Sequence, residues 1–271
     1  MWKKLNAHKR LPTALVLIAA IIALLHGAPP WLLAGVIQLF ILGALLEFYG
    51  LARKRRLQPL VPVGAACALI LGLPSVFPGL PQGAAFPAAL ATAGIFYLLY
   101  VNTLERMEAF PRSLAVTLFG AAYLSLTLNH VLPLRREFGP WSVTFLLAVV
   151  IAGDTGAFLI GSLLGRHKMF PLASPNKTWE GAAGGLIFAA LGAFVARELF
   201  FAELSPLRAA CYGLALHAFA QLSDPMESLF KRAAGVKDSG RLFPGHGGLL
   251  DRVDSLILSL PFFYYLMLFR P

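Results

Sequence analysis

The sequence predicts an all-α, polytopic integral membrane protein with about nine transmembrane helices and a cytoplasmic N-terminus. Of its 271 residues, 58% are hydrophobic and only 13% are charged, and the mean hydropathy is +0.72. Soluble domains usually carry about a quarter charged residues. Apolar runs of spanning length recur along the whole chain, and lysines and arginines gather at their ends.

The first apolar run, residues 11–25, follows four basic residues within the first ten. This pattern is also typical of a secretory signal peptide, which here would end near Gly27. We prefer an uncleaved first helix, because every later part of the chain is also membranous and the topology requires it.

Eight further apolar segments are long enough to cross the hydrocarbon core. They lie at 31–49, 60–77, 84–102, 114–132, 141–164, 182–202, 206–223 and 252–269. About five helices therefore fall within residues 1–140, which carry no clear motif. The polar motifs fall within residues 141–271, where we expect cytoplasmic loops at 165–181 and 224–251.

The distribution of basic residues sets the expected orientation. With the N-terminus inside, both motif-bearing loops are cytoplasmic, and only five of the 23 lysines and arginines fall on the outer side. Those five are Arg135, Arg136, Arg197, Arg208 and Arg270. Near the inner end of the second helix, Glu47 precedes four basic residues, and we expect it to pair with a cation or to reach the interface.

The net charge of +10 points to anionic partners. The sequence has no basic and aromatic groove pattern, and its basic residues cluster at the ends of apolar segments. We therefore expect membrane lipids and phosphorylated substrates as partners, and no nucleic acid.

Residues 223–255 combine four aspartates, a glutamate, five basic residues and a histidine between two apolar segments. A charge at mid-bilayer costs about 2.5 kcal/mol or more, so we interpret this stretch as an active site. If the helix before it continues, four polar side chains share one face. They are Asp224, Glu227, Ser228 and Lys231.

Asp251 and Asp254 lie three residues apart at the start of the last apolar helix. Together with Asp224 they offer hard oxygen ligands of the kind that hold Mg²⁺. Basic residues between them can receive phosphates, and the GHGG run at 245–248 lets backbone amides approach an anion. The alternatives are a helix N-cap for Asp251 and an ordinary positive flank for Lys231 and Arg232.

A second polar stretch runs from Gly153 to Gly181. Asp154 interrupts an apolar helix halfway along, which indicates a functional residue or a structural one between closely packed helices. SPNKTWEG at 174–181 places hydroxyls and a lysine at a helix start, which suits a triphosphate. A capping box with Thr178 or Ser174 as N-cap is the alternative.

Several of these motifs resemble one known family. SLFKR at 228–232, KDSG at 237–240, PGHGG at 244–248 and DRVD at 251–254 look like the signature of the phosphatidate cytidylyltransferases, or CDP-diacylglycerol synthases. GDTGA at 153–157 and SPNKTWEG are similar to the same family. Ser223 and Asn176 depart from its usual glycine and lysine. The resemblance covers about residues 153–255.

The resemblance implies that the phosphate of phosphatidate attacks the α-phosphorus of CTP, which yields CDP-diacylglycerol and pyrophosphate for phospholipid biosynthesis. It places the enzyme in the inner (plasma) membrane with its active site facing the cytoplasm. It also implies Mg²⁺ as cofactor, admits a second metal ion, and allows a homodimer.

By resemblance and spacing, Asp224, Asp251 and Asp254 are the expected metal ligands. The expected catalytic residues are these three with Lys231, Arg232, Lys237 and Asp238. The expected substrate-binding residues are Asp154, Ser174, Lys177, Thr178, Glu180, Ser228, His246 and Arg252, with Ser228 and His246 as orienting groups.

Four alternative functions compete with this interpretation. An isoprenoid alcohol kinase or a cytidylyltransferase for ether lipids would use the same nucleotide. A transporter would use Asp154 and Asp224 to line a pathway, but it predicts two related halves with interrupted helices, and the sequence shows no such repeat. A structural scaffold would not retain so many charges.

Overall fold

The structure is a computed structural model that describes residues 19–240 and 247–269. The first predicted membrane segment lies partly outside this range. Each of the eight later apolar segments corresponds to a helix. Five helical stretches in the described part are long and apolar enough to cross a membrane. An all-α membrane protein is therefore confirmed, whereas nine spans and a cytoplasmic N-terminus stay predictions.

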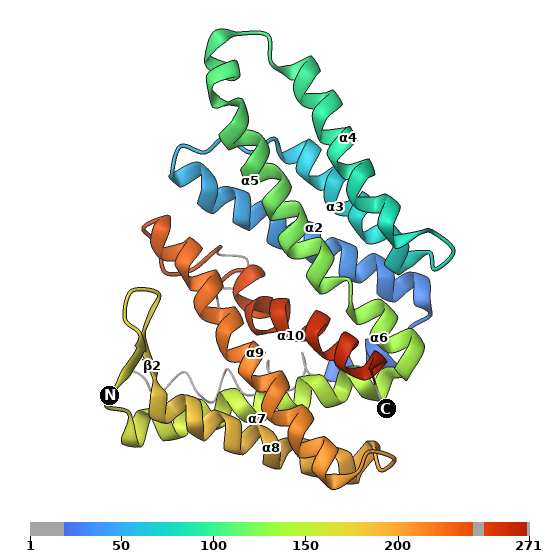
Figure 1. The fold of residues 1–271 in the computed structure, drawn as a ribbon, viewed down its shortest axis with the longest axis vertical. Coiled ribbons are helices and arrows are strands. Elements are labelled where there is room, and N and C mark those ends of the chain that lie inside the picture. Colours follow the sequence, from blue (N-terminus) through green and yellow to red (C-terminus); the bar gives the residue numbers. More distant parts are fainter. Residues whose placement is uncertain (1–18, 241–246, 270–271) are drawn as a thin grey trace.

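The N-terminal helices form the upper part of Figure 1. Pro at the first position of α2 and the Thr103 side chain, which accepts a hydrogen bond from the amide of Arg106, mark two of the helix starts. The helices are α2 (Pro30–Lys54), α3 (Val61–Val76), α4 (Gln82–Tyr100), α5 (Leu104–Leu128) and α6 (Val131–Phe138).

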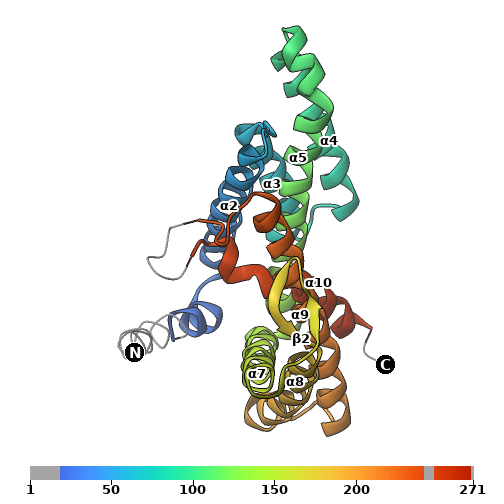
Figure 2. The same ribbon diagram turned by 90° about the vertical axis from the view of Figure 1, so that its left-hand side faces the viewer.

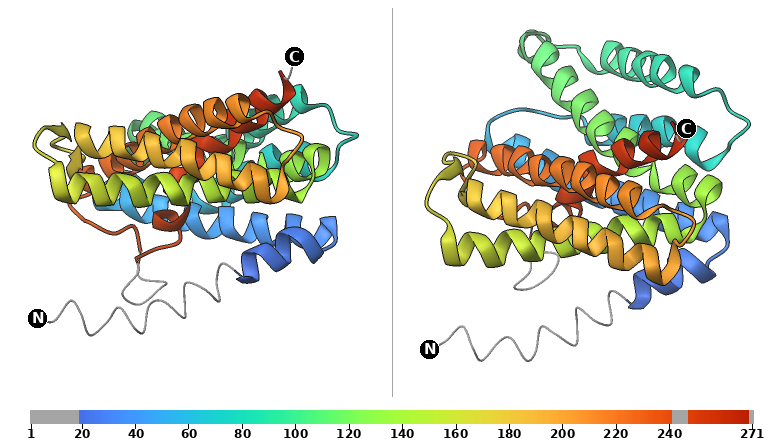
Figure 3. Two further views of the ribbon diagram at one scale, coloured as in Figure 1. Left: turned by 90° about the horizontal axis from the view of Figure 1, so that it is seen from below. Right: turned by 60° about the horizontal axis from the view of Figure 1, so that its bottom comes forward.

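The C-terminal helices α7, α8 and α9 run side by side in the lower part of the molecule (Figures 1 and 3). Helix α10 packs on α9 and also contacts α2 and α5, so it lies between the two groups (Figure 2). The helices are α7 (Pro140–Leu164), α8 (Trp179–Phe200), α9 (Pro206–Ala233) and α10 (Leu250–Leu268).

The structure adds detail to both expected loops. The segment 165–181 contains an antiparallel hairpin of β1 (Lys168–Phe170) and β2 (Ser174–Thr178). The predicted loop at 224–251 begins as helix, because α9 continues to Ala233. The charged side chains in this last part of α9 form ion pairs. The helix can therefore continue beyond the apolar run.

An aromatic cluster joins the two groups of helices. The ring of Phe230 on α9 lies 5.2 Å from Phe48 on α2 and 5.7 Å from Tyr123 on α5. Tyr49 donates a buried hydrogen bond of 2.6 Å to the carbonyl of Thr117. The ring contacts of Phe230 hold the C-terminal half of α9 against the N-terminal helices, and the Tyr49 hydrogen bond joins α2 to α5.

Small residues allow α7, α8 and α9 to pack closely, as is usual for helices in membranes. A Cβ added at Gly213 would lie 2.7 Å from the carbonyl oxygen of Ala189 and 2.7 Å from the Cβ of Ala193. The backbone of α9 therefore approaches α8 at a position that no larger residue fits.

We expect Gly213→Val to destabilise the protein by about 1 to 3 kcal/mol, because the added atoms must separate α8 from α9. Thermal unfolding in detergent measures the loss. Gly94→Val is the matched control, since a Cβ there meets nothing within 4 Å. Equal melting temperatures for the two variants would contradict the close packing.

Candidate active site

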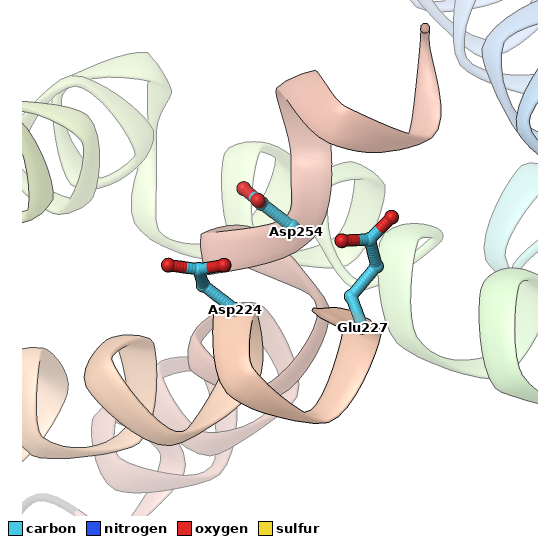
Figure 4. A group of neighbouring side chains, drawn as sticks. All are labelled: Asp224, Glu227 and Asp254. Carbon is cyan, nitrogen blue, oxygen red and sulfur yellow. The ribbon is translucent and has the colours of Figure 1, made fainter. Parts of the chain in front are cut away.

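Three carboxylates converge where α9 meets the start of α10. Asp224 and Glu227 stand one turn apart on α9, and Asp254 faces them from α10 (Figure 4). One oxygen from each lies within 4.8 Å of the others. Such a set of hard oxygen ligands suits a divalent cation such as Mg²⁺.

Ser223 connects the two helices that carry this cluster. Its hydroxyl donates to the backbone carbonyl of Asp254 and accepts a hydrogen bond of 3.2 Å from the amide of Leu258. Ser223 is fully buried. The position that departs from the family's usual glycine therefore bonds α9 to α10 directly beside the carboxylates.

Asp251, an expected metal ligand, lies outside this three-carboxylate group and is bound by other protein groups. Its Oδ1 lies 2.7 Å from the ammonium of Lys231. Its Oδ2 accepts hydrogen bonds from the amides of Ser239 and Gly248 at 2.9 and 2.8 Å. It is not the N-cap of α10, which is Leu249.

These contacts also set the charge of Asp251, which precedes the predicted membrane span. Burial acts to raise the pKa of its carboxyl, but hydrogen bonds from Lys231, Gly248 and Ser239 outweigh burial and hold the pKa below its usual value. Asp251 is therefore an anion at neutral pH and a fixed partner for Lys231.

Glu227, and not Asp251, is the third member of the carboxylate group. It is fully buried, and neither of its oxygens has a well-aligned hydrogen bond. The Lys231 ammonium contacts Oε2 as an ion pair, which leaves coordination capacity on the carboxylate. Its spacing of three residues from Asp224 was the sequence signal for this role.

The hairpin brings Lys177 to the same place. Its ammonium lies 2.8 Å from Oδ2 of Asp224 and 3.3 Å from the carbonyl of Gln221. Ser228 donates to the other oxygen of Asp224 at 3.3 Å. Arg232 at the end of α9 donates to the carbonyl of Ala173 in the hairpin. The two predicted loops therefore meet at one site.

Other residues around the hairpin shape the loop. Thr178 is the N-cap of α8 and accepts a hydrogen bond of 3.1 Å from the amide of Gly181, so capping accounts for its hydroxyl. Ser174 opens β2 and is not an N-cap. The Glu180 carboxylate accepts hydrogen bonds from the backbone amides of Arg166 and His167, and it lies 2.5 Å from Nδ1 of the His167 ring.

The remaining expected residues are spread around the cluster. Asp154 on α7 interacts with Ser255 and with the charges of Lys177 and Asp224, which adds a third helix to the site. Other expected residues, Lys237, Asp238 and Arg252, are exposed. His246 lies outside the described residues.

Glu47 was missed as part of this region. Instead of pairing with a neighbouring cation, its carboxylate accepts hydrogen bonds of 2.9 Å from the amides of Leu249 and Leu250 and from the hydroxyl of Ser239. The amides at the start of α10 are thus bound by protein carboxylates, where the glycine run had suggested a substrate anion.

Residues 8–269 match the sequence model of the cytidylyltransferase family. The chain belongs to this family. The match extends the likeness beyond residues 153–255 into the N-terminal helices, and it makes the chain a nucleotidyltransferase.

This cytidylyltransferase is similar to several bacterial phosphatidate cytidylyltransferases. It is 34% identical to the phosphatidate cytidylyltransferase of Staphylococcus saprophyticus, with 93% of this chain and 97% of the relative covered. It is 35% identical to that of Staphylococcus haemolyticus over the same shares. It is 34% identical to that of Bacillus subtilis, over 65% of each chain.

We expect Lys231→Met to destabilise the cytidylyltransferase by about 3 to 5 kcal/mol, because two buried carboxylates lose their counter-charge. Lys177→Met removes a pair whose side chains are 28% and 30% exposed, and it should cost about 1 kcal/mol or less. Thermal unfolding in detergent without divalent metal compares them. A smaller loss for Lys231→Met would show that its ion pairs do not hold α9 to α10.

Proposed function

We propose that this chain transfers CMP from CTP to phosphatidate, which forms CDP-diacylglycerol and releases pyrophosphate for phospholipid biosynthesis. The observation that carries the proposal is the group of Asp224, Glu227 and Asp254 beside two lysines, in a chain of this family. Two polyanions must meet in this reaction, and the site supplies both metal ligands and fixed cations.

The donor set fits Mg²⁺. Asp224, Glu227 and Asp254 would hold the ion, so Glu227 replaces the expected Asp251 in our proposal. Oε1 of buried Glu227 has no hydrogen-bond partner among the described residues, while Lys231 contacts Oε2, and this supports the choice because a buried carboxylate oxygen rarely lacks a partner. When bound, the ion would neutralise phosphate oxygens and favour in-line attack. A second metal ion stays a prediction from the resemblance.

The protein's own groups would orient the two substrates. Lys177 is partly exposed and lies against the cluster, where it can bind the CTP phosphates. Arg232, Lys237 and Arg252 are exposed near the two loops and would bind phosphates of either substrate. Ser228 holds one Asp224 oxygen in place. The phosphate of phosphatidate is already an anion and needs no general base.

The proposed setting is the plasma membrane, with several spans and the site facing the cytoplasm. The C-terminal ends of α2 and α9 and the hairpin lie toward the left in Figure 1, and these segments carry the basic residues 53–56, Lys231, Arg232, Lys168 and Lys177. The positive-inside rule places that side in the cytoplasm, where CTP is available. A homodimer stays a prediction from the resemblance.

The first test uses purified protein in detergent with radiolabelled CTP and phosphatidate. We expect Mg²⁺-dependent label in a chloroform-soluble lipid, with equal release of pyrophosphate. Asp224→Asn and Asp254→Asn should each lower kcat by about 100-fold or more, because each removes charge from the cluster. Glu108→Gln, at an exposed position on α5, is the control.

A folded preparation that makes no nucleotide lipid would overturn the proposed reaction. Label that appears as CDP together with a phosphorylated alcohol would show a kinase instead. The two asparagine variants must keep the melting temperature of the parent protein. Only then does their lower kcat report a loss of catalysis and not a loss of folding.

A Mg²⁺ titration tests which carboxylates bind the metal. We expect Glu227→Gln to raise the Mg²⁺ concentration for half-maximal rate by roughly tenfold or more, which corresponds to about 1.4 kcal/mol. Asp251→Asn should change that concentration by less than about threefold, or 0.7 kcal/mol, because its oxygens bind Lys231 and amides. The reverse order would return Asp251 to the ligand set.

A further inference from the structure

The carboxylate of Glu47 bonds the N-terminal half of the chain to the start of α10. Its Oε1 accepts a hydrogen bond from the amide of Leu249. Its Oε2 accepts hydrogen bonds from the amide of Leu250 and the hydroxyl of Ser239, and all three distances are 2.9 Å. Hydrogen bonds to an ionised acceptor are about twice as strong as neutral ones. One side chain on α2 therefore binds groups about two hundred residues away in the sequence.

Helix α10 has no side-chain cap of its own. Its N-cap residue is Leu249, which cannot accept a hydrogen bond through its side chain. The first amides of a helix lack partners within the helix, and a negative charge beside them is favoured by the helix dipole. Glu47 supplies both the acceptors and the charge from another helix.

The neighbouring loop is built around this carboxylate. A Cβ added at Gly240 would lie 2.2 Å from Oε1 of Glu47, and one at Gly248 would lie 2.2 Å from Oε2. Both distances are far below van der Waals contact. Gly240 and Gly248 therefore allow the Glu47 carboxylate to approach the backbone of this loop.

A continuous path of polar contacts leads from Glu47 to the proposed metal ligands. The hydroxyl of Ser239 lies 2.9 Å from Oε2 of Glu47 and 2.8 Å from Oδ2 of Asp251. Since a serine has one hydroxyl hydrogen, the two carboxylates share it. Asp251 in turn binds Lys231, which contacts Glu227.

We propose that Glu47 is a positioning residue for cytidylyl transfer. It fixes the first turn of α10, and thereby sets Asp254 and Asp251 relative to the residues of α9. This inference rests on the proposed function, because it assigns Asp254 and Glu227 to the reaction. In this proposal, Glu47 itself touches neither substrate nor metal.

Glu137 on α6 provides a matched control, because its side chain also contacts α10. Its Oε2 accepts a hydrogen bond of 3.1 Å from the hydroxyl of Tyr264 near the other end of α10. Both glutamates tie α10 to the N-terminal helices, but only Glu47 binds the end that carries the site. A purely structural role would make the two residues equivalent.

The test compares Glu47→Gln with Glu137→Gln in the turnover assay. We expect Glu47→Gln to lower kcat by roughly 10- to 100-fold, as for residues that orient metal ligands, while KM for CTP changes by less than about threefold. Glu137→Gln should keep kcat within about threefold. Melting temperatures of both variants should stay within a few degrees of the parent.

A second measurement does not depend on activity. Hydrogen exchange should show faster exchange of the amides of Leu249 and Leu250 in Glu47→Gln, and unchanged exchange there in Glu137→Gln. If the parent protein makes no nucleotide lipid, the proposed function is wrong. The exchange experiment still tests the contact between Glu47 and the start of α10, because it needs no turnover.

Gly240→Ala tests the same contact with the carboxylate present. The new methyl group should displace Glu47 and lower kcat, whereas Gly50→Ala, where a Cβ meets nothing within 4 Å, should not. In the Glu47→Ala background the effect of Gly240→Ala should vanish, since the two positions then no longer touch.

Three results would overturn the proposal. The first is an equal loss of kcat in Glu47→Gln and Glu137→Gln. The second is unchanged exchange at the start of α10 in Glu47→Gln. The third is additive effects of Gly240→Ala and Glu47→Ala.

Discussion

The ion pairs of one buried lysine organise the region where the chemistry is placed. Lys231 on α9 contacts Glu227 on its own helix and Asp251 at the start of α10. Removing charges from water is costly unless each finds a partner, so these three groups must stay together in the folded protein. Their grouping fixes the start of α10 beside the last turns of α9, and it leaves Asp224, Glu227 and Asp254 facing one another.

The site is shared by parts of the chain that lie far apart in sequence. Helix α7 contributes Asp154, the hairpin contributes Lys177, and α9 and α10 contribute the three carboxylates. The N-terminal helices support this region through the aromatic contacts of Phe230 and the carboxylate of Glu47. This arrangement gives a physical reason for a family match that extends over residues 8–269.

The membrane setting and the polar site place opposite demands on the same helices. Helix α9 packs on α8 through Gly213 in its apolar half. Its other half carries the buried charged side chains of Glu227 and Lys231. The change occurs near Ser223, whose hydroxyl bonds α9 to α10. A continuous helix thus joins the closely packed helices α7 and α8 to the carboxylate cluster.

Sequence by itself determined the class of the protein, the positions of its helices and the two polar stretches of the site. Apolar runs predict helices because the bilayer leaves few ways to satisfy the backbone, and eight predicted segments match described helices. The spacing of Asp224 and Glu227 placed them on one helical face. Only the tertiary structure decided that Glu227 joins the carboxylate cluster, that Asp251 binds Lys231, and that Glu47 binds the start of α10. Spacing within one helix cannot reveal which groups a distant helix supplies, because that choice depends on how buried charges and amides are paired in the folded chain.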